Sequence, residues 1–297
     1  MTILALEIGP TRFAAIEIAD DVGSDQLQQI PVPQTGAWDQ LRELALGIAA
    51  GREVAAVGIA SSGPIDMSAG VVAPQEIGEW QVGFPLVESI EQLFPAASVA
   101  LALDGVCLSL AERHFGGTTE VMDSLSIYVG ETIVGGVMVG GFAVVGRTGN
   151  AGQIGHVLVP GYDDPCPCGG RGCLEAVAGG AALTKWARGQ GWGGNSVEAL
   201  AADAQAGDRI AVSALERAGT ALGRAIASVA ALLDFDRAVI GGPIAAPGSA
   251  IWKPLQNAIA LHARLPVLTG LRAVPSDLED LGLLAGAGVI ALISQEG

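Results

Sequence analysis

Three of the four cysteines in this chain of 297 residues lie close together, behind one of its three histidines. The candidate ligands are His156, Cys166, Cys168 and Cys173, and three thiolates with one imidazole make a complete tetrahedral shell for zinc. The glycine-rich turn at 169–172 lets the backbone fold tightly enough for Cys173 to return to the same ion. A shell of four protein ligands leaves no position for water, so the sequence predicts a structural zinc and not a hydrolytic one.

The histidine of this cluster could also serve a second ligand. A zinc-bound imidazole keeps one ring nitrogen free to donate a hydrogen bond, so His156 is a candidate contact for a small molecule as well. The alternative for the cluster is a set of incidental buried thiols, which their concentration in one short segment disfavours. Cys107 stands apart in the sequence and is interpreted as a small core residue.

The composition limits the class of protein that could carry such a site. Half of the residues are hydrophobic, 4% are aromatic and 43 are glycine, which is typical of an α/β protein with many tight turns. The formal net charge of −16 disfavours nucleic-acid and membrane binding, because an acidic surface repels phosphate groups. No apolar stretch reaches the roughly 20 residues that span a bilayer. Few cysteines without disulfide spacing indicate a reducing compartment, so we expect a cytoplasmic protein.

The apolar patterns predict the elements that would position the site. Two apolar runs on either side of Pro10 and Thr11 predict a β-hairpin at the start of the chain, and helical periodicity follows over 38–50. The other expected strands lie at 54–66, 98–105, 124–130, 135–146, 237–243 and 266–275, and the other expected helices at 86–94, 106–115, 173–233 and 280–293.

These elements predict an α/β protein of two lobes that share a cleft. The N-terminal lobe covers residues 1–115 and is completed by the C-terminal helix at about 281–297, and the C-terminal lobe covers 116–280 with the zinc loop. No linker rich in proline and serine separates the lobes. Because nothing precedes the first strand, we do not expect an N-terminal helix-turn-helix.

Four segments of the chain resemble the ROK family of the actin-like ATPase superfold. They are AGQIGH (Ala151–His156), CPCGGRGCLE (Cys166–Glu175), GIASSGPID (Gly58–Asp66) and AVIGGP (Ala238–Pro243). Their order and spacing agree with the family over nearly the whole chain. The resemblance implies a two-lobed actin-like, ribonuclease H-like fold with a central cleft that binds ATP and a hexose. It also implies a homo-oligomer, a dimer or a tetramer.

The resemblance also gives roles to particular positions. Asp104 matches the general base that takes the proton of the sugar hydroxyl, and His156 and Glu175 match residues that hydrogen-bond sugar hydroxyls. Gln153 and Gln75 stand at two further positions that contact sugar in the family. The residues expected near ATP and its Mg²⁺ are Gly9, Thr11, Thr132, Gly135, Gly136, Gly241 and Gly242. Without the family, Asp104 could be a strand-end carboxylate facing solvent, and Glu175 an acid favoured by a helix dipole.

Both phosphate-binding loops depart from the family pattern. The usual Asp-Ile-Gly-Gly-Thr-Lys is replaced by the residues from Glu7 to Arg12, in which Pro10 removes a backbone N–H. Glu7 is one methylene longer than the usual aspartate and is expected to reach magnesium only through water. In the second loop, Glu131 would bring a carboxylate near the phosphates, and like charges ~4 Å apart repel by about 4 kcal/mol at an effective dielectric of 20.

The sugar side departs from the pattern as well. Leu103 replaces the asparagine that precedes the base, and Gln153 replaces a glutamate. Two functions remain open. One is an ATP-dependent kinase that phosphorylates a hexose or N-acetylhexosamine, with Asp104 as base and Mg²⁺ offsetting the phosphate charge. The alternative is a non-catalytic relative that binds a sugar or sugar phosphate and acts as a regulator or sensor. A regulator that binds DNA is disfavoured by the acidic charge.

Overall fold

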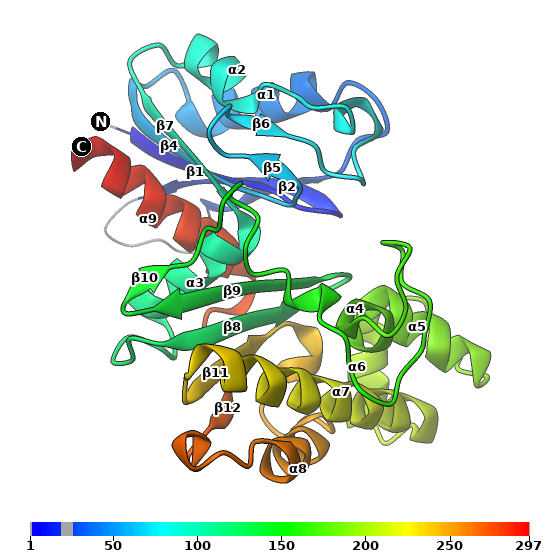
Figure 1. Cartoon of the computed structure of the whole chain (residues 1–297). Coiled ribbons are helices and arrows are strands. Elements are labelled where there is room, and N and C mark those ends of the chain that lie inside the picture. Colours follow the sequence, from blue (N-terminus) through cyan, green and yellow to red (C-terminus); the bar gives the residue numbers. More distant parts are fainter. Residues whose placement is uncertain (1, 19–25, 297) are drawn as a thin grey trace. The chain divides into compact units, whose positions relative to one another are not determined.

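The computed structural model describes residues 2–18 and 26–296, which divide into two compact units (Figure 1). Unit 1 consists of Met1–Ala111, Val144–Ala151 and Asp280–Gly297, and unit 2 of Glu112–Ala143 and Gly152–Glu279. The C-terminal segment therefore belongs to the same unit as the first strand. No helix in the described part of the chain is long and apolar enough to cross a membrane.

Unit 1 is built on a five-stranded mixed sheet. Its strands, in spatial order, are β3 (Gln28–Pro31), β2 (Arg12–Ile18), β1 (Thr2–Ile8), β4 (Val54–Ser61) and β7 (Ser98–Leu103). The first three form an antiparallel meander, whereas β1, β4 and β7 run parallel. The register aligns Ile8 with Ser61 and Ser61 with Leu103. The carboxyl ends of the three parallel strands therefore lie at one edge of the sheet.

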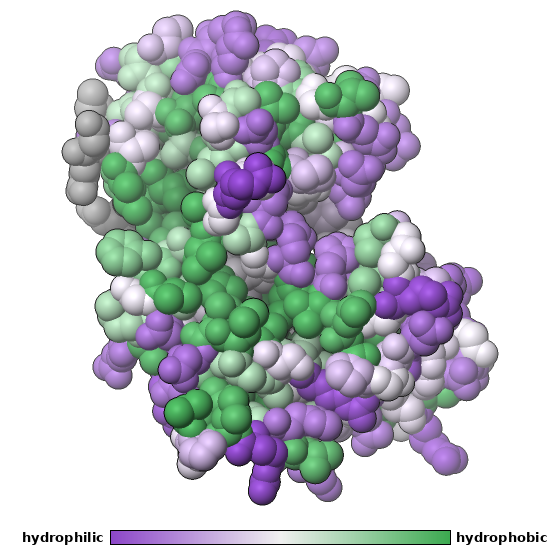
Figure 2. Space-filling view, in the orientation of Figure 1, coloured by the Kyte–Doolittle hydropathy of each residue, from purple (hydrophilic) through white to green (hydrophobic). Residues whose placement is uncertain are grey.

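Helices cover both faces of this sheet. Figure 1 shows α1 (Ala37–Ala49) and α2 (Leu86–Leu93) on one face and α9 (Gly282–Glu296) on the other. Helix α1 packs on β1, β2 and β3 through the apolar stripe that its periodicity predicts, and Leu41 is completely buried. Figure 2 shows mostly hydrophilic residues over α1 and α2, as expected for the outer sides of amphipathic helices.

Aromatic stacking fixes the segment between β4 and α2. This segment contains a short hairpin, β5 (Ile65–Asp66) and β6 (Val71–Val72), and then the 3₁₀-helix η2 (Gly78–Trp80). The ring of Trp80 stacks on Phe84 at 4.5 Å and on Phe13 of β2 at 5.7 Å between centroids. The loop that carries Gln75 is thereby held against the sheet.

Helix α9 packs so closely on its neighbours that backbone atoms contact backbone atoms. A Cβ added at Gly58 of β4 would lie 1.8 Å from the carbonyl oxygen of Ala287. A Cβ added at Gly286 would lie 1.8 Å from the carbonyl oxygen of Cys107 in α3 (Asp104–Phe115). Backbone atoms cannot rotate out of the way, so the helix fits only because both positions are glycine.

Unit 2 repeats the strand pattern of unit 1. Its sheet has, in spatial order, β10 (Phe142–Ala143), β9 (Ile133–Val139), β8 (Ser124–Val129), β11 (Arg237–Gly241) and β12 (Arg272–Pro275). Strands β8, β9 and β10 form an antiparallel meander, and β8, β11 and β12 run parallel. The carboxyl ends of these parallel strands again meet at one edge.

The long helix α7 (Arg209–Leu233) organises the helical part of unit 2. It packs against α4 (Leu174–Ala178), α5 (Gly180–Gly189), α6 (Val197–Gln205) and α8 (Trp252–His262). The remaining short helices are η3 (Ile154–His156), η4 (Pro243–Ala245), η5 (Pro266–Leu268) and, in the turn before α9, η6 (Glu279–Leu281). Asp208 caps α7 by accepting hydrogen bonds from the amides of Ile210 and Ala211, which have no partner inside the helix.

Most of the elements expected from the sequence are confirmed, and several are wrong in their bounds. The strand expected over 54–66 ends at Ser61, and the one expected over 135–146 is divided into β9 and β10. The strand expected over 266–275 is a 3₁₀-helix that begins at Pro266, followed by a strand that begins only at Arg272. Proline favours the first turn of a helix, and its missing N–H weakens a strand. The helical region expected over 173–233 is divided into four helices. The sequence interpretation also missed β3 and the small β5–β6 hairpin.

The close approach of α9 predicts a large effect of a single methyl group. We expect Gly58→Ala to lower the free energy of unfolding by about 3 kcal/mol, because the added carbon overlaps a backbone oxygen. Urea denaturation measures the loss. The matched control is Gly78→Ala in the same unit, where an added Cβ meets no atom within 4 Å. Equal stability of Gly58→Ala and the parent protein would show that the helix does not pack this closely.

Candidate functional site

The four predicted zinc ligands come together in unit 2. The candidate ligand atoms of His156, Cys166, Cys168 and Cys173 all lie within 4.8 Å of one another. The sulfur of Cys166 is 3.8 Å from Nδ1 of His156, and the sulfurs of Cys168 and Cys173 are 3.8 Å apart. Two sulfurs held ~2.3 Å from a tetrahedral zinc would lie ~3.8 Å apart. The ligand set and these two separations therefore fit a zinc ion.

The turn between the cysteines has the geometry that its glycines allow. The amide of Cys166 donates to the carbonyl of Gly170, and Gly169 has φ of 89°. At Gly172, with φ of 74°, an added Cβ would lie 2.7 Å from the carbonyl oxygen of Tyr162. Both left-handed positions favour glycine. The turn therefore returns Cys173 to the cluster as the sequence predicted.

Glu175 connects the zinc loop with the second phosphate loop. Its Oε2 accepts a hydrogen bond of 2.7 Å from the amide of Ile133, the first residue of β9. The same oxygen lies 3.1 Å from a Cβ placed on Gly155, the residue before His156. The carboxylate is thus fixed between two segments that the resemblance places near sugar and near phosphate. Gln153 and His156 flank Gly155 in the sequence, and the side chains of both are exposed.

The second loop expected to bind phosphate is the turn from β8 to β9. The amide of Gly130 donates to the carbonyl of Thr132 at 3.1 Å and closes the turn. The first residues of α5 hold it from the other side, because the amides of Gly180 and Ala181 donate to the carbonyls of residues 130 and 131. The side chain of Glu131 is exposed. The turn is therefore rigidly held, while its carboxylate is free to turn toward solvent.

The glycines expected near ATP in unit 2 occupy two kinds of position. Gly135 lies inside β9, where an added Cβ would be 2.2 Å from Cγ2 of Ile154, so it allows the η3 segment to pack on the strand. Gly136 follows it in the same buried strand. Gly241 ends β11, and at Gly242 an added Cβ would lie 2.3 Å from the carbonyl oxygen of residue 129 at the end of β8. Gly241 and Gly242 thus lie beside the Gly130 turn at the carboxyl edge of the sheet, where open α/β sheets bind ligands.

The candidate base lies at the corresponding edge of unit 1. Asp104 follows β7 directly, in register with Gly9 after β1, and its Oδ1 accepts a hydrogen bond of 2.6 Å from the amide of Gly105. The pKa of Asp104 is raised to about 7, mainly by burial and also by the charges of Glu7 and Glu76, while the hydrogen bond from Gly105 opposes the rise. A carboxylate with a pKa near neutrality suits proton transfer at neutral pH.

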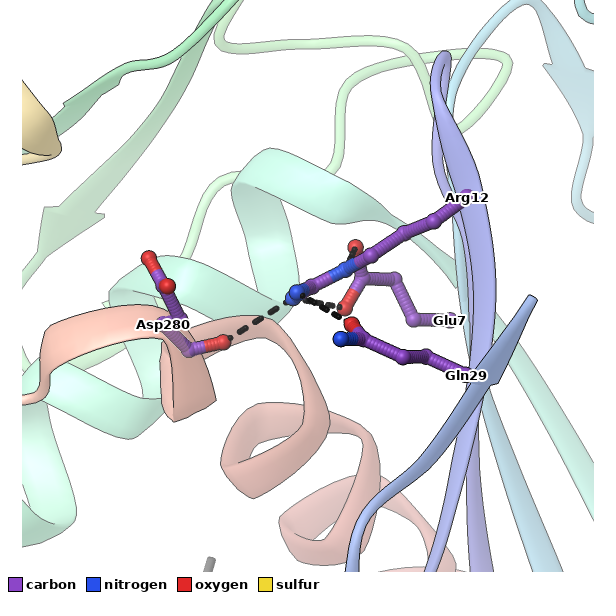
Figure 3. A network of polar contacts seen from close by, with 4 residues as sticks. All are labelled: Glu7, Arg12, Gln29 and Asp280. Carbon is purple, nitrogen blue, oxygen red and sulfur yellow. Dashed lines mark hydrogen bonds and ion pairs between the residues drawn. The ribbon is translucent and has the colours of Figure 1, made fainter. Parts of the chain in front are cut away.

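A second carboxylate at this edge is paired with an arginine (Figure 3). Glu7 is 4% exposed, and the guanidinium of Arg12 donates from Nε to Oε1 at 3.1 Å and from Nη2 to Oε2 at 3.0 Å. Arg12 also donates to Oε1 of Gln29 at 2.9 Å and to the carbonyl of Asp280 at 3.1 Å. Burial raises the pKa of Glu7, and the hydrogen bond and charge of Arg12 oppose that rise.

This pair changes the expectation for magnesium. Glu7 was expected to reach the ion through water, but both of its carboxylate oxygens accept hydrogen bonds from Arg12. A metal-bound water would therefore have to compete with a two-pronged guanidinium contact. The hairpin tip beside the pair is closed by a bond of 3.0 Å from the amide of Gly9 to the carbonyl of Arg12, which leaves Thr11 exposed.

The sequence interpretation missed the pairing of Arg12 with Glu7. A signal was present, since a hairpin that places Ile8 opposite Phe13 makes Glu7 and Arg12 diagonal neighbours on one face. Leu103, next to the base, is 1% exposed and offers no polar group, as its type implies. Gln75 is exposed, with its amide donating to the carbonyl of Ala73 at 3.3 Å.

Comparisons with known proteins agree with these motifs. The sequence model of the ROK family matches residues 3–293. An N-acetylmannosamine kinase from Citrobacter koseri is 33% identical over 82% of this chain and 84% of its own length. The structure of a ROK hexokinase from Thermus thermophilus is 30% identical, covers 100% of both chains and superposes with a TM-score of 0.79.

The same fold occurs in a protein of another class. The structure of a ROK family transcriptional regulator, a homolog of the E. coli MLC protein, superposes with a TM-score of 0.83 at 24% identity. The match covers 99% of this chain and 78% of the regulator. These matches show the actin-like ATPase fold that the resemblance implied. The fold alone does not separate a kinase from a regulator.

The pair in Figure 3 predicts an asymmetric effect of substitutions. Arg12→Met should lower the free energy of unfolding by about 3 kcal/mol, because it leaves a buried carboxylate without a counter-charge. The double variant Glu7→Gln with Arg12→Met should recover most of that loss, since no charge then remains buried. Thermal unfolding of both variants and the parent protein measures this. A double variant no more stable than Arg12→Met would contradict the pairing.

Proposed function

Because the chain belongs to the ROK family, as its match over residues 3–293 shows, we propose that it is an ATP-dependent sugar kinase. The proposed reaction transfers the γ-phosphoryl group of ATP to a hydroxyl of a hexose or N-acetylhexosamine. The names of the similar proteins support this class of reaction, and they differ in the sugar. The proposal therefore specifies the reaction and the class of acceptor.

The observation that carries the proposal is the environment of Asp104. A carboxyl group at a strand end facing water would keep an ordinary pKa, whereas that of Asp104 is raised to about 7, mainly by burial. The group is then ionised in a large fraction of molecules at neutral pH and still basic enough to accept a proton. Such a value has no structural benefit, because burying a carboxylate without a cation reduces stability.

The other polar residues have the chemistry of sugar recognition. Glu175 is a carboxylate that the amide of Ile133 holds through Oε2, and carboxylates accept hydrogen bonds from sugar hydroxyls. His156 would bind zinc through Nδ1 and donate from its other ring nitrogen. Gln153 and Gln75 are exposed amides that can either donate or accept. We assign these four residues to the sugar.

The proposed reaction combines a proton transfer to Asp104 with a displacement at the γ-phosphorus of ATP. Asp104 takes the proton of the attacking sugar hydroxyl, and the hydroxyl oxygen forms a bond to the γ-phosphorus of ATP. The bond from that phosphorus to the bridging oxygen breaks, and its electron pair leaves with ADP. Mg²⁺, when bound, would neutralise charge on the phosphates. Backbone amides at Thr11 and at the Gly130–Thr132 turn, with the glycines at 241 and 242, are the groups we assign to the nucleotide.

We further propose that the cluster of His156, Cys166, Cys168 and Cys173 holds a structural zinc ion. The support is its ligand set and the sulfur separation of 3.8 Å. The ion would fix the segment that leads into α4 and thereby the position of Glu175. Its role is to hold residues in place, because no ligand position remains for water.

A non-catalytic sugar-binding regulator or sensor is the alternative. The observation that favours it is the pairing of Glu7 with Arg12. Both carboxylate oxygens of Glu7 accept hydrogen bonds from Arg12, so they are less available to a magnesium ion or its bound water. The carboxylate of Glu131 in the second loop acts in the same direction. A sensor would bind sugar through Glu175 and His156 without turning over ATP.

Release of ADP tests the proposed function. With MgATP and a panel of hexoses and N-acetylhexosamines, we expect sugar-dependent ADP release that Asp104→Asn slows by about a thousandfold. The asparagine keeps the shape and an acceptor for the amide of Gly105 but cannot take a proton. Sugar binding by calorimetry is the control and should be nearly unchanged in Asp104→Asn. Sugar binding without ADP release in the parent protein would select the sensor.

The dependence of the rate on pH tests the base. Because protonated Asp104 cannot accept a proton, kcat/KM should rise with pH and reach half of its maximum near pH 7. Glu7→Gln should move this midpoint to lower pH, since the charge of Glu7 raises the pKa of Asp104. A midpoint near pH 4, or one that does not move in Glu7→Gln, would remove Asp104 from this role.

Metal analysis of the purified chain tests the zinc site. We expect about one zinc per chain, and Cys168→Ser should lose the metal and several degrees of thermal stability, because metal binding contributes to folding. The matched control is Cys107→Ser, which removes the cysteine outside the cluster and should retain the metal. Equal zinc in Cys168→Ser and the parent protein would contradict the assigned ligands.

A further inference from the structure

A polar groove runs between α7 and α8 in unit 2, outside every residue assigned above. Its cavity of about 590 Å³ lies within the usual range of small-molecule sites. A Cβ at Gly219 would lie 2.2 Å from the carbonyl oxygen of Ile251, and one at Gly223 would lie 2.4 Å from that of Leu255. Both contacts advance by four residues along each helix, so the two helices run side by side in the same direction. This close backbone contact holds together the two helices whose residues line the groove.

The groove concentrates positive charge in an acidic chain. Arg224 and Lys253 line it beside a single acid, Glu216, whereas the whole chain has 15 lysines and arginines against 31 acids. Lys253 makes no salt bridge within residues 2–18 and 26–296, and its side chain is exposed. A cation without a counter-ion in a concave site attracts a small anion.

The rest of the lining fits hydroxyl groups better than a nucleobase. Thr220, Ser249 and Asn257 contribute two hydroxyls and an amide, and no phenylalanine, tyrosine or tryptophan lines the groove on which a base could stack. Glu216 lies on α7 two turns before Arg224, so one end of the groove accepts hydrogen bonds and the other end is cationic. A ligand with hydroxyls at one end and a dianion at the other matches this polarity.

We propose that the groove between α7 and α8 is a binding site for a phosphorylated sugar, with Lys253 and Arg224 on the phosphate and Glu216 on the hydroxyls. Phosphate is the anion of choice because ammonium and guanidinium groups both form charge-assisted hydrogen bonds with it. The proposal does not require the chain to be a kinase, since a sensor could bind the same ligand in this groove.

Arg224 links this site to the zinc loop. Its Nη1 donates to the carbonyl of Pro160 at 2.6 Å, and its guanidinium lies 5.5 Å from the ring centre of Tyr162. Both residues belong to the segment between His156 and Cys166. A phosphate that binds Arg224 would compete with the hydrogen bond from Arg224 to Pro160. It would thereby affect the segment that follows His156, a proposed sugar contact, and this couples the groove to the proposed sugar site.

Calorimetric titration of the full zinc-loaded chain tests the proposal. The probes are glucose 6-phosphate, inorganic phosphate and glucose, each without nucleotide. We expect glucose 6-phosphate to bind, and Lys253→Gln to weaken it about tenfold, the value of one charge-assisted hydrogen bond. The chain has only one other lysine, Lys185 on α5, so the exposed Lys185→Gln is the matched control and should bind as the parent does.

Lys253→Gln also separates this groove from the proposed kinase site, because glucose 6-phosphate bound beside Asp104 would not respond to a change of Lys253. Hydrogen exchange of residues 157–165 should slow when the probe binds. No binding, equal binding by Lys253→Gln, or equal affinity for inorganic phosphate alone would overturn the proposal. A change in oligomeric state of Lys253→Gln without any binding would also overturn it, because a second copy of the chain would then cover the groove.

Discussion

The close contact of α9 with its neighbours is the constraint on which unit 1 depends. Glycines at positions 58 and 286 allow backbone to meet backbone, so α9 packs closely on the face of the sheet formed by β1, β4 and β7. The register of these parallel strands places their carboxyl ends at one edge. Asp104 follows β7 at that edge, and burial raises its pKa. The position proposed for the base therefore depends on a fold in which residues 58 and 286 are glycine.

The charges at that edge explain how a modified phosphate hairpin can remain folded. A glutamate that is 4% exposed would be costly alone, and Arg12 supplies its counter-charge from the diagonal position on the next strand. The same negative charge raises the pKa of Asp104, so the pair and the base belong to one electrostatic unit. The charges at Glu7 and Arg12, two positions that depart from the family pattern, thus compensate each other.

The sequence predicted the gathering of His156 with three cysteines and the first hairpin well because each depends on local pattern. Cysteine spacing and the glycines at 169–172 specify a turn, and alternating apolar residues specify paired strands. It did not predict that Gly135 serves packing against Ile154, since contacts between distant segments leave no local signal. It also overextended the strand before Arg272, where Pro266 starts a short helix instead. The Arg12–Glu7 pair required the hairpin register, which follows from the fold.

The central claim is that this chain moves a phosphoryl group onto a sugar. Phosphorus NMR of the protein with MgATP and each candidate sugar observes that event directly. The account predicts a new phosphate monoester resonance that grows as the γ-phosphate signal of ATP declines, for at least one hexose or N-acetylhexosamine. An ATP spectrum that stays unchanged with every sugar, in a protein shown to bind one of them, would contradict it.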